Sequence, residues 1–222
     1  MGKNTFKITE QEPMEETTTK PSWWQRYKAF REKHTFAQYL QRLFLKALLY
    51  FLGISVGLVI IFKFVPVWFT PTMLDRKLEA LADGRDTEIY SDWEPYENIS
   101  KEVALAVVAS EDQLFPEHHG FDFDAMWGAF RHNFKGKKIK GASTISQQVA
   151  KNVFLWQGRS YVRKALEAYF TLLIELIWGK ERILEVYLNV AEMGKMTFGV
   201  EAASLKYYGH SAKYLTRTEA AR

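Results

Sequence analysis

The sequence of 222 residues contains no cysteine, which excludes disulfide bonds and thiolate chemistry. Its five histidines are scattered and match no standard zinc spacing, which argues against a structural zinc site. It has no internal repeat and no convincing series of alternating strand residues. No recognised nucleic-acid module accompanies its net charge of +4, so we expect no nucleic-acid partner. With 47% hydrophobic residues, the chain can nevertheless build a core, and we expect an all-α fold.

One long stretch lacks acidic residues. Between Ala125 and Leu166 there is no Asp or Glu, whereas nine basic residues occur there: Arg131, Lys135, Lys137, Lys138, Lys140, Lys151, Arg159, Arg163 and Lys164. Outside this window, acidic residues outnumber basic residues. Such a local concentration of positive charge is typical of a site for a phosphate-bearing partner.

A single apolar run predicts a membrane helix. Leu43 to Phe62 is 20 residues long and carries one charge, Lys46, near its start. This length spans the hydrocarbon core of a bilayer, and a lysine near the end can reach the headgroups. A buried core helix fits less well, because even core helices rarely lack polar residues over this length. A cleaved signal peptide fits less well, because no small-residue cleavage site follows. Basic residues gather before the run: Arg26, Lys28, Arg31, Lys33, Arg42 and Lys46. By the positive-inside rule, the N-terminus is cytoplasmic and the rest lies outside.

The chain therefore divides into four expected parts. Residues 1–42 form a cytoplasmic tail, polar and disordered up to residue 20 and then basic and aromatic like a segment that lies on anionic headgroups. Residues 43–65 form the membrane helix, and 66–84 form a linker with a short amphipathic helix. That helix has one expected apolar face, made of Met73, Leu74, Leu78 and Leu81. Residues 85–222 form one domain with expected helices at 100–111, 144–155, 160–178 and 180–192, and a short extended piece near Ile89 and Tyr90.

The stretch Gly141–Asn152 reads as a turn that runs into a helix. Thr144 can cap this helix, and Gln147 completes a capping box. One face is apolar: Ile145, Val149 and Val153. The other face carries Gln147, Gln148, Lys151 and Asn152. Polar side chains beside free backbone N–H groups suit an anionic, oxygen-rich ligand, although a solvated face is the alternative. Lys137, Lys138 and Lys140, just before the helix, are expected to touch headgroups or phosphate, with simple solvation as the alternative.

Two glutamates flank the basic window. Ser100 caps a helix in which Val103, Val107 and Glu111 follow at four-residue steps, so we expect Glu111 to face inward as a general base or acid, or else to leave the helix end for water. Glu167 follows Arg163 and Lys164 on a helix that Ser160 caps. This second set is either an ordinary helical ion-pair set or a carboxylate that holds cations for a phosphate.

A carboxylate–histidine cluster follows the first glutamate, with Asp112 and His118 close in sequence. Its spacing fits no standard zinc arrangement. We therefore expect no metal site and no required cofactor, with a divalent cation such as Mg²⁺ or Mn²⁺ as an alternative.

Five stretches resemble the ordered motifs of the peptidoglycan glycosyltransferases, glycosyltransferase family 51. The matching residues are Glu111, Asp112, Phe115, His118 and Gly120; then Gly141, Ser143, Thr144, Ile145, Gln147, Gln148, Lys151 and Asn152; then Arg163, Lys164 and Glu167; then Lys180, Ile183, Leu184, Tyr187 and Asn189; then Phe198, Gly199, Val200, Ala202 and Ala203. The resemblance covers about residues 85–221. No transpeptidase region follows, so the chain resembles the monofunctional enzymes of Gram-negative bacteria.

The resemblance implies a lysozyme-like helical domain with a membrane-facing lobe, held at the cell inner membrane by a single pass, with the catalytic domain periplasmic. Its substrates would be lipid II and the growing lipid-linked glycan chain, joined by an inverting reaction that makes β-1,4 bonds. Glu111 would remove the proton from the acceptor hydroxyl. The leaving pyrophosphate would be held by Glu167 together with Lys151, Arg159, Arg163 and Lys164. The oxygens of the donor sugar and phosphate would be held by Ser143, Gln147, Gln148 and Asn152. Other cell-wall synthesis proteins are further candidate partners.

Two other classes of protein remain open. A membrane-anchored, lysozyme-like hydrolase would also use an acidic residue, but its substrate carries no pyrophosphate and needs no basic window. A non-catalytic cell-wall-binding protein would leave Glu111 unexplained.

The last residues raise a separate expectation. Thr216 and Glu219 form another capping box, which announces a helix shortly before Arg222. The family pattern continues with a further helix and a C-terminal segment. We therefore expect the domain to be C-terminally short, and residues 1–222 to be less stable than an extended version.

Overall fold

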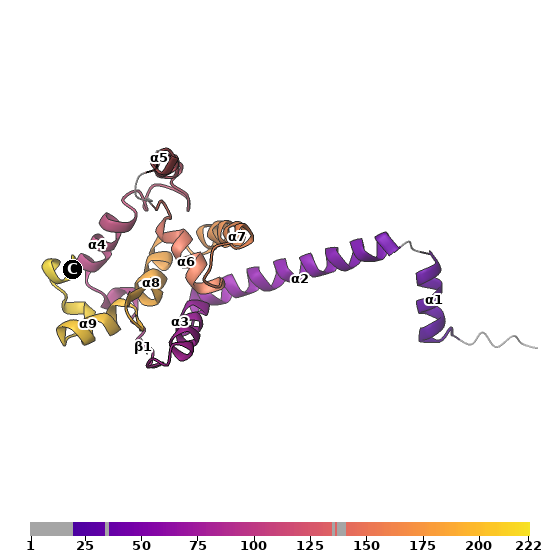
Figure 1. The fold of residues 1–222 in the computed structure, drawn as a ribbon, viewed down its shortest axis with the longest axis horizontal. Helices are drawn as coiled ribbons and strands as arrows, with labels where there is room; N and C mark the ends of the chain where they lie inside the picture. The colour runs from indigo at the N-terminus through magenta and orange to yellow at the C-terminus, as the bar shows by residue number, and fades with distance from the viewer. Residues whose placement is uncertain (1–19, 34–35, 135, 137–140) are drawn as a thin grey trace, which may run out of the picture. The chain divides into compact units, whose positions relative to one another are not determined.

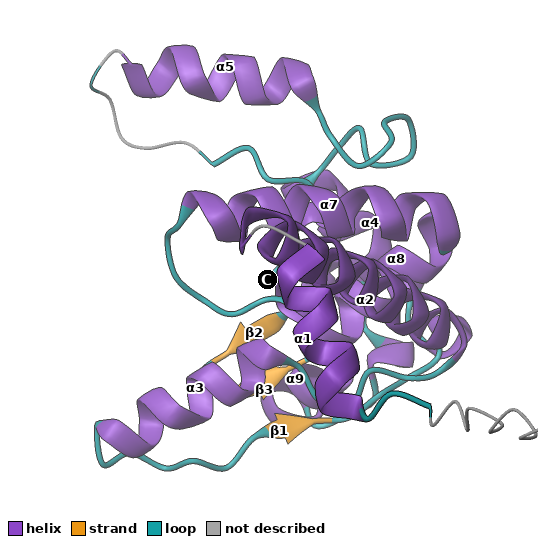
Figure 2. Cartoon of the chain, turned by 90° about the vertical axis from the view of Figure 1, so that its right-hand side faces the viewer, coloured by secondary structure: helices purple, strands orange, loops and turns teal. Residues whose placement is uncertain are grey.

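The computed structural model describes residues 20–33, 36–134, 136 and 141–222. The expected disordered tail, apart from Lys20, and the three lysines at 137, 138 and 140 lie outside these residues. The chain forms two compact units, one up to Leu52 and one from Gly53 to Arg222. Figures 1 and 2 show that the described chain is built mainly of helices, with three short strands.

The helices confirm most of the expected positions. In chain order the α-helices are α1 (Trp23–Lys33), α2 (Phe36–Phe64), α3 (Pro71–Ala82), α4 (Lys101–Glu111), α5 (Phe123–Phe134), α6 (Ile145–Phe154), α7 (Tyr161–Ile177), α8 (Lys180–Val190), α9 (Val200–Tyr208) and α10 (Arg217–Ala220). Two 3-10 turns, η1 (Tyr96–Asn98) and η2 (Ala212–Tyr214), complete them. Helices α5 and α9 were not predicted from the sequence.

Polar caps set where the expected helices begin. The Ser100 side chain accepts a hydrogen bond from Glu102 N, and the Ser160 side chain accepts one from Arg163 N. Thr144 and Thr216 each form a complete capping box. Each cap satisfies a backbone N–H that has no partner inside the helix, so these short polar residues fix the helix starts.

The core of the second unit surrounds α6. Its apolar face is confirmed, because Ile145, Val149 and Val153 are buried. Helices α3, α7 and α8 pack against α6. A small sheet has the strand order β1 (Tyr90–Ser91), β3 (Thr197–Phe198), β2 (Glu192–Gly194), with β1 parallel and β2 antiparallel to β3. The extended piece expected near Tyr90 is thus confirmed, whereas β2 and β3 were not predicted.

The apolar face predicted for α3 is wrong. Met73 is buried, but Leu74, Leu78 and Leu81 are exposed. The helix instead buries Thr72, Met73 and Ala80, and the Thr72 hydroxyl donates a 3.4 Å hydrogen bond to the backbone oxygen of Asn152 on α6. Helix α3 packs against α6 through the side that carries Thr72, so the three leucines stay outside the core.

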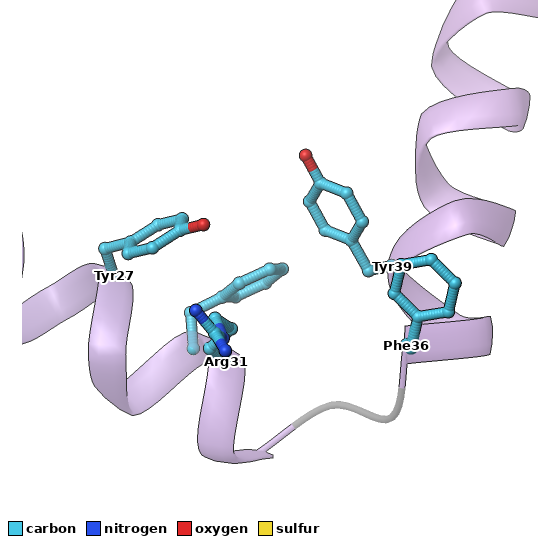
Figure 3. Close-up of a pocket in the computed structure, with 5 residues that line it drawn as sticks. Tyr27, Arg31, Phe36 and Tyr39 are labelled. Carbon is cyan, nitrogen blue, oxygen red and sulfur yellow. The ribbon is translucent and has the colours of Figure 1, made fainter.

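Within the first unit, α1 and the start of α2 present aromatic rings. Figure 3 shows Tyr27 and Arg31 on α1 near Phe36 and Tyr39 on α2, where they line a hollow of about 370 Å³. The α2 helix is the one described helix long and apolar enough to cross a membrane. It extends beyond the predicted span, Leu43–Phe62, by seven residues at its start and two at its end.

Candidate active site

An open cleft lies where α4 ends and α6 begins. It has a volume of about 630 Å³ and is lined by Glu111, the turn that follows it, the start of α5 and the segment before α6. Two residues predicted to bind substrate, Ser143 and Gln148, line the same cleft as Glu111. The structure therefore brings together groups that are separated by more than thirty positions in the sequence.

The inward placement predicted for Glu111 is wrong. Glu111 is the last residue of α4 and is exposed, and its Oε2 accepts a 2.9 Å hydrogen bond from Gln148 Nε2. The buried carboxylate is the next one, Asp112, because the helix ends at Glu111 and the chain turns there. Glu111 thus presents a carboxylate to the cleft, oriented from one side by α6.

Asp112 links the end of α4 to the start of α6. Its Oδ2 accepts a 3.0 Å hydrogen bond from Ile145 N, and both its oxygens lie about 3 Å from His118 Nε2. Gly120 N donates to His118 Nδ1 at 3.2 Å, so Nε2 is the ring nitrogen that carries the proton towards Asp112. Among the described residues, no three His, Cys, Asp or Glu side chains are grouped so that they could hold a metal ion.

Two of the four polar residues predicted on α6 are engaged inside the protein. Gln147 is buried, and its Oε1 accepts a 3.0 Å hydrogen bond from Thr144 N in the capping box. Asn152 is also buried, with Oδ1 3.4 Å from the Thr72 hydroxyl. In this structure Gln147 and Asn152 therefore hold α6 in place, whereas Gln148 reaches the cleft.

Glu167 gathers two cations, as its spacing predicted. It is only 2% exposed, and its Oε2 accepts a 2.7 Å hydrogen bond from Arg163 Nη1. Its other oxygen, Oε1, pairs with the ammonium group of Lys164. Because each charged hydrogen bond fixes one oxygen, the buried carboxylate holds both cations on one side of α7.

Lys151 on α6 adds a third cation to this group. Burial lowers the pKa of its ammonium group, and the positive charges of Arg163 and Lys164 lower it further, while Glu167 opposes them. Three cations around one carboxylate leave an excess of positive charge, which suits an anionic ligand. Arg159 is exposed on the loop before α7, and the described part of the chain holds no ion pair to it.

One residue near the cleft was not predicted as a site residue. Tyr187 on α8 is buried, and burial raises the pKa of its hydroxyl, which the negative charge of Glu111 raises further. The sequence placed Tyr187 only in the fourth motif. Both the burial of Tyr187 and its closeness to Glu111 depend on how α8 packs in the fold. No local sequence pattern could therefore have identified the two residues as neighbours.

Comparison with known proteins gives the same result as the motifs. A family model described as transglycosylase matches residues 77–222. A biosynthetic peptidoglycan transglycosylase of Pseudomonas putida (strain F1) is 52% identical over 177 residues, which cover 80% of this chain and 75% of that protein. One of Chromohalobacter salexigens is 53% identical over 181 residues, or 82% of this chain and 77% of that protein. The chain therefore belongs to the transglycosylase family, the peptidoglycan glycosyltransferases that its five motifs resemble.

Proposed function

We propose that this enzyme polymerises lipid II into the β-1,4-linked glycan strands of peptidoglycan and releases polyprenyl pyrophosphate. The observation that supports this best is the pairing of two sites. An exposed carboxylate, Glu111, lies in a cleft, and a cluster of cations surrounds the buried Glu167. The first suits removal of a proton, and the second suits a leaving group that carries two phosphates.

The reaction joins two lipid-linked sugars. Glu111 accepts the proton of the acceptor 4-hydroxyl while that oxygen forms a bond to the anomeric carbon of the donor. The bond from the anomeric carbon to the pyrophosphate oxygen breaks at the same time, on the opposite face, so the configuration inverts. The hydrogen bond from Gln148 holds the carboxylate of Glu111 towards the cleft. Ser143 is exposed at the same wall and is free to contact sugar or phosphate oxygens.

The leaving pyrophosphate is neutralised by the cluster on α6 and α7. The cluster places three positive charges in one region, those of Lys151, Arg163 and Lys164. Glu167 holds Arg163 and Lys164 in position. Arg159 joins them from the preceding loop. Fixed cations stabilise charge as it develops on the leaving group, which lowers the barrier most where water is excluded. That no cofactor is required, with Mg²⁺ or Mn²⁺ as the alternative, stays a prediction.

The alternatives differ in what they require of the cation cluster. A hydrolase that cuts glycan has no pyrophosphate to hold, and a wall-binding protein needs no carboxylate aimed into a cleft. The cluster and Glu111 are both accounted for only by transfer from a pyrophosphate-linked donor.

The test is product analysis with purified lipid II. Polymer supports a transferase, fragments of preformed glycan indicate a hydrolase, and unchanged substrate indicates a binding protein. Glu111→Gln keeps the shape of the side chain and its contact with Gln148 but cannot accept the proton, so turnover should fall by about 10²–10⁴-fold. The matched control is Glu117→Gln, the same change at an exposed glutamate of the following turn. Near-normal turnover by Glu111→Gln would remove Glu111 from the mechanism.

The one long apolar helix among the described residues supports a setting in the membrane. We place it in the cell inner membrane with one pass, the N-terminus cytoplasmic and the catalytic unit periplasmic, since the basic residues gather before the span. Protease added outside spheroplasts should reach residues after Phe64 but not those before Leu43. Other cell-wall synthesis proteins remain predicted partners.

A further inference from the structure

The loop between α6 and α7 carries Arg159, an exposed cation assigned above to the leaving pyrophosphate. The other three cations of that set lie on helices, whereas Arg159 does not. An arginine on a loop binds an anion well only if the backbone beneath it is fixed, because binding otherwise has to order both the side chain and the loop. The contacts that hold this loop therefore matter for binding of the donor.

Helix α3 holds the loop at Gln157. The backbone N–H of Gln157 donates a 2.6 Å hydrogen bond to Asp75 Oδ2, and its side-chain Nε2 donates a 2.7 Å hydrogen bond to the Thr72 hydroxyl. Thr72 and Asp75 are three positions apart on α3, so they lie on the same side of that helix. One turn of α3 thus binds both the backbone and the side chain of a residue more than eighty positions away.

This turn of α3 is itself fixed. Thr72 is buried, and its hydroxyl lies 3.4 Å from both the backbone oxygen and Oδ1 of Asn152 on α6. Arg76, the residue after Asp75, donates a 2.8 Å hydrogen bond to Glu192 of β2. Helix α3 is therefore joined to α6 and to the small sheet, so it can hold the loop in one place.

Little of the loop is left between its anchors. Ser160 caps α7 by accepting a hydrogen bond from Arg163 N, and two residues, Gly158 and Arg159, separate it from Gln157. Gly158 has a φ of +130°, a conformation that residues with a side chain rarely adopt. The backbone of Arg159 is thus fixed by α3 on one side and by α7 on the other.

The charge of Asp75 is unfavourable for an anion site. Burial lowers the pKa of the Lys151 ammonium group, and the positive charge of the neighbouring Arg76 lowers it further, so α3 lies close to the cations. A carboxylate at the edge of such a cluster repels an anionic ligand. The hydrogen bond that Asp75 accepts from the loop gives a reason for its position that its charge does not.

We propose that Asp75 and Thr72 are positioning residues for the donor: they fix the α6–α7 loop through Gln157, and the fixed loop holds Arg159 towards the donor pyrophosphate. This inference rests on the proposed function, because it requires a pyrophosphate as the leaving group. Neither residue contacts the donor, and both act through Arg159. Loss of the Asp75 contact frees the loop, so binding then has to order it at a cost in affinity.

The charge and the hydrogen bond of Asp75 predict opposite changes in affinity. The Kd for polyprenyl pyrophosphate is measured with the full chain in detergent. Asp75→Ala removes both charge and acceptor, and we expect the Kd to rise by about 2–10-fold, which corresponds to one ordinary hydrogen bond. Asp75→Asn removes the charge but keeps an oxygen acceptor, and should bind at least as tightly as the wild type. The matched control is Asp83→Ala, at the other end of α3, which should leave the Kd unchanged.

A double substitution tests whether Asp75 acts through Arg159. Arg159→Ala should raise the Kd by about tenfold or more, because a charged hydrogen bond is lost. Asp75→Ala should then have no further effect in that background, whereas a general loosening of the domain would add to it.

A wild-type Kd for Asp75→Ala, or the same rise with and without Arg159, would overturn the proposal. A wild-type Kd for Arg159→Ala would remove Arg159 from the donor site and overturn the proposal with it. Polymer formation from lipid II by the unmodified chain is measured separately, so failure of this anchor is distinct from failure of the proposed reaction.

Discussion

Replacing Glu167 by glutamine separates its two roles, in stability and in binding. The carboxylate is almost fully buried and holds Arg163, whose side chain is 13% exposed, and Lys164, whose side chain is 47% exposed. A hydrogen bond to a charged group contributes about 1.5–3 kcal/mol, whereas the half-exposed lysine pair contributes about 0.2–1 kcal/mol. The amide keeps one acceptor for Arg163 but points N–H donors at the ammonium group. We expect Glu167→Gln to lower the free energy of unfolding by about 2–3 kcal/mol.

The same change should weaken binding of the donor. Without the carboxylate, two like charges face each other and move apart towards water, and Lys151 loses the one nearby negative charge that opposes the lowering of its pKa. Titration of the full chain in detergent with a pyrophosphate-linked donor measures this as a higher Kd, and thermal unfolding of the same sample measures the loss of stability.

A matched control exists on the same helix. Glu175 is also a buried carboxylate that pairs with a lysine, Lys180, at 2.8 Å. Glu175→Gln should therefore lower stability by a similar amount but leave the Kd for the donor unchanged. If both variants lost donor affinity equally, the effect would come from general loosening of α7, and the assignment of Glu167 to the donor site would be wrong.

Three further changes test the surroundings of the site. Lys151→Arg should flatten the pH dependence of donor binding. Burial lowers the pKa of Lys151, so the wild type loses this charge, and donor affinity with it, at a lower pH than an exposed lysine would, whereas arginine stays charged. Titration of donor binding across alkaline pH measures the difference. Thr144→Ala should cost about 1–2 kcal/mol of stability through its lost cap, and Thr216→Ala, at an exposed capping box, should cost less; chemical unfolding of both variants compares them. Gly120→Ala should destabilise the domain by about 1–3 kcal/mol, because φ is +89° and a Cβ would lie 2.7 Å from Thr171 Cγ2; an unchanged melting temperature would contradict this.

Features that depend on residues close together in the sequence could be predicted. The starts of α4, α6 and α7 follow from one short polar side chain each, because a cap satisfies backbone groups within three residues. The ion pairs of Glu167 follow in the same way from helical spacing. The start of α5 could also have been read locally, since Asp122 Oδ1 accepts a 2.8 Å hydrogen bond from Ala125 N. The membrane span follows from its length and composition.

Features that depend on distant parts of the chain could not be predicted. Helix α9 begins at Val200, and the residue at its N-cap position, Gly199, has no side chain to cap it. The sheet brings Tyr90 beside Thr197, more than a hundred positions away. The sequence pattern shows on which side of α6 Gln147 lies. It does not show that the amide of Gln147 closes the capping box and is therefore not available to a ligand. The contact between Ser55 and Tyr169 is equally hidden, because a lone serine in an apolar span has no local partner.

The observed position of Glu111 differs from the predicted one, and the difference shows what orients its carboxylate in the cleft. Helical periodicity assigned the inward position to Glu111, but the helix ends there, and Asp112 takes the buried position instead. Asp112 binds the first backbone N–H of α6, and Gln148, one turn later on α6, binds Glu111. The orientation of Glu111 therefore comes from its neighbour in sequence and from α6, not from burial of its own side chain. An exposed carboxylate held in this way keeps access to the cleft, which a base that must accept a proton from an incoming hydroxyl requires.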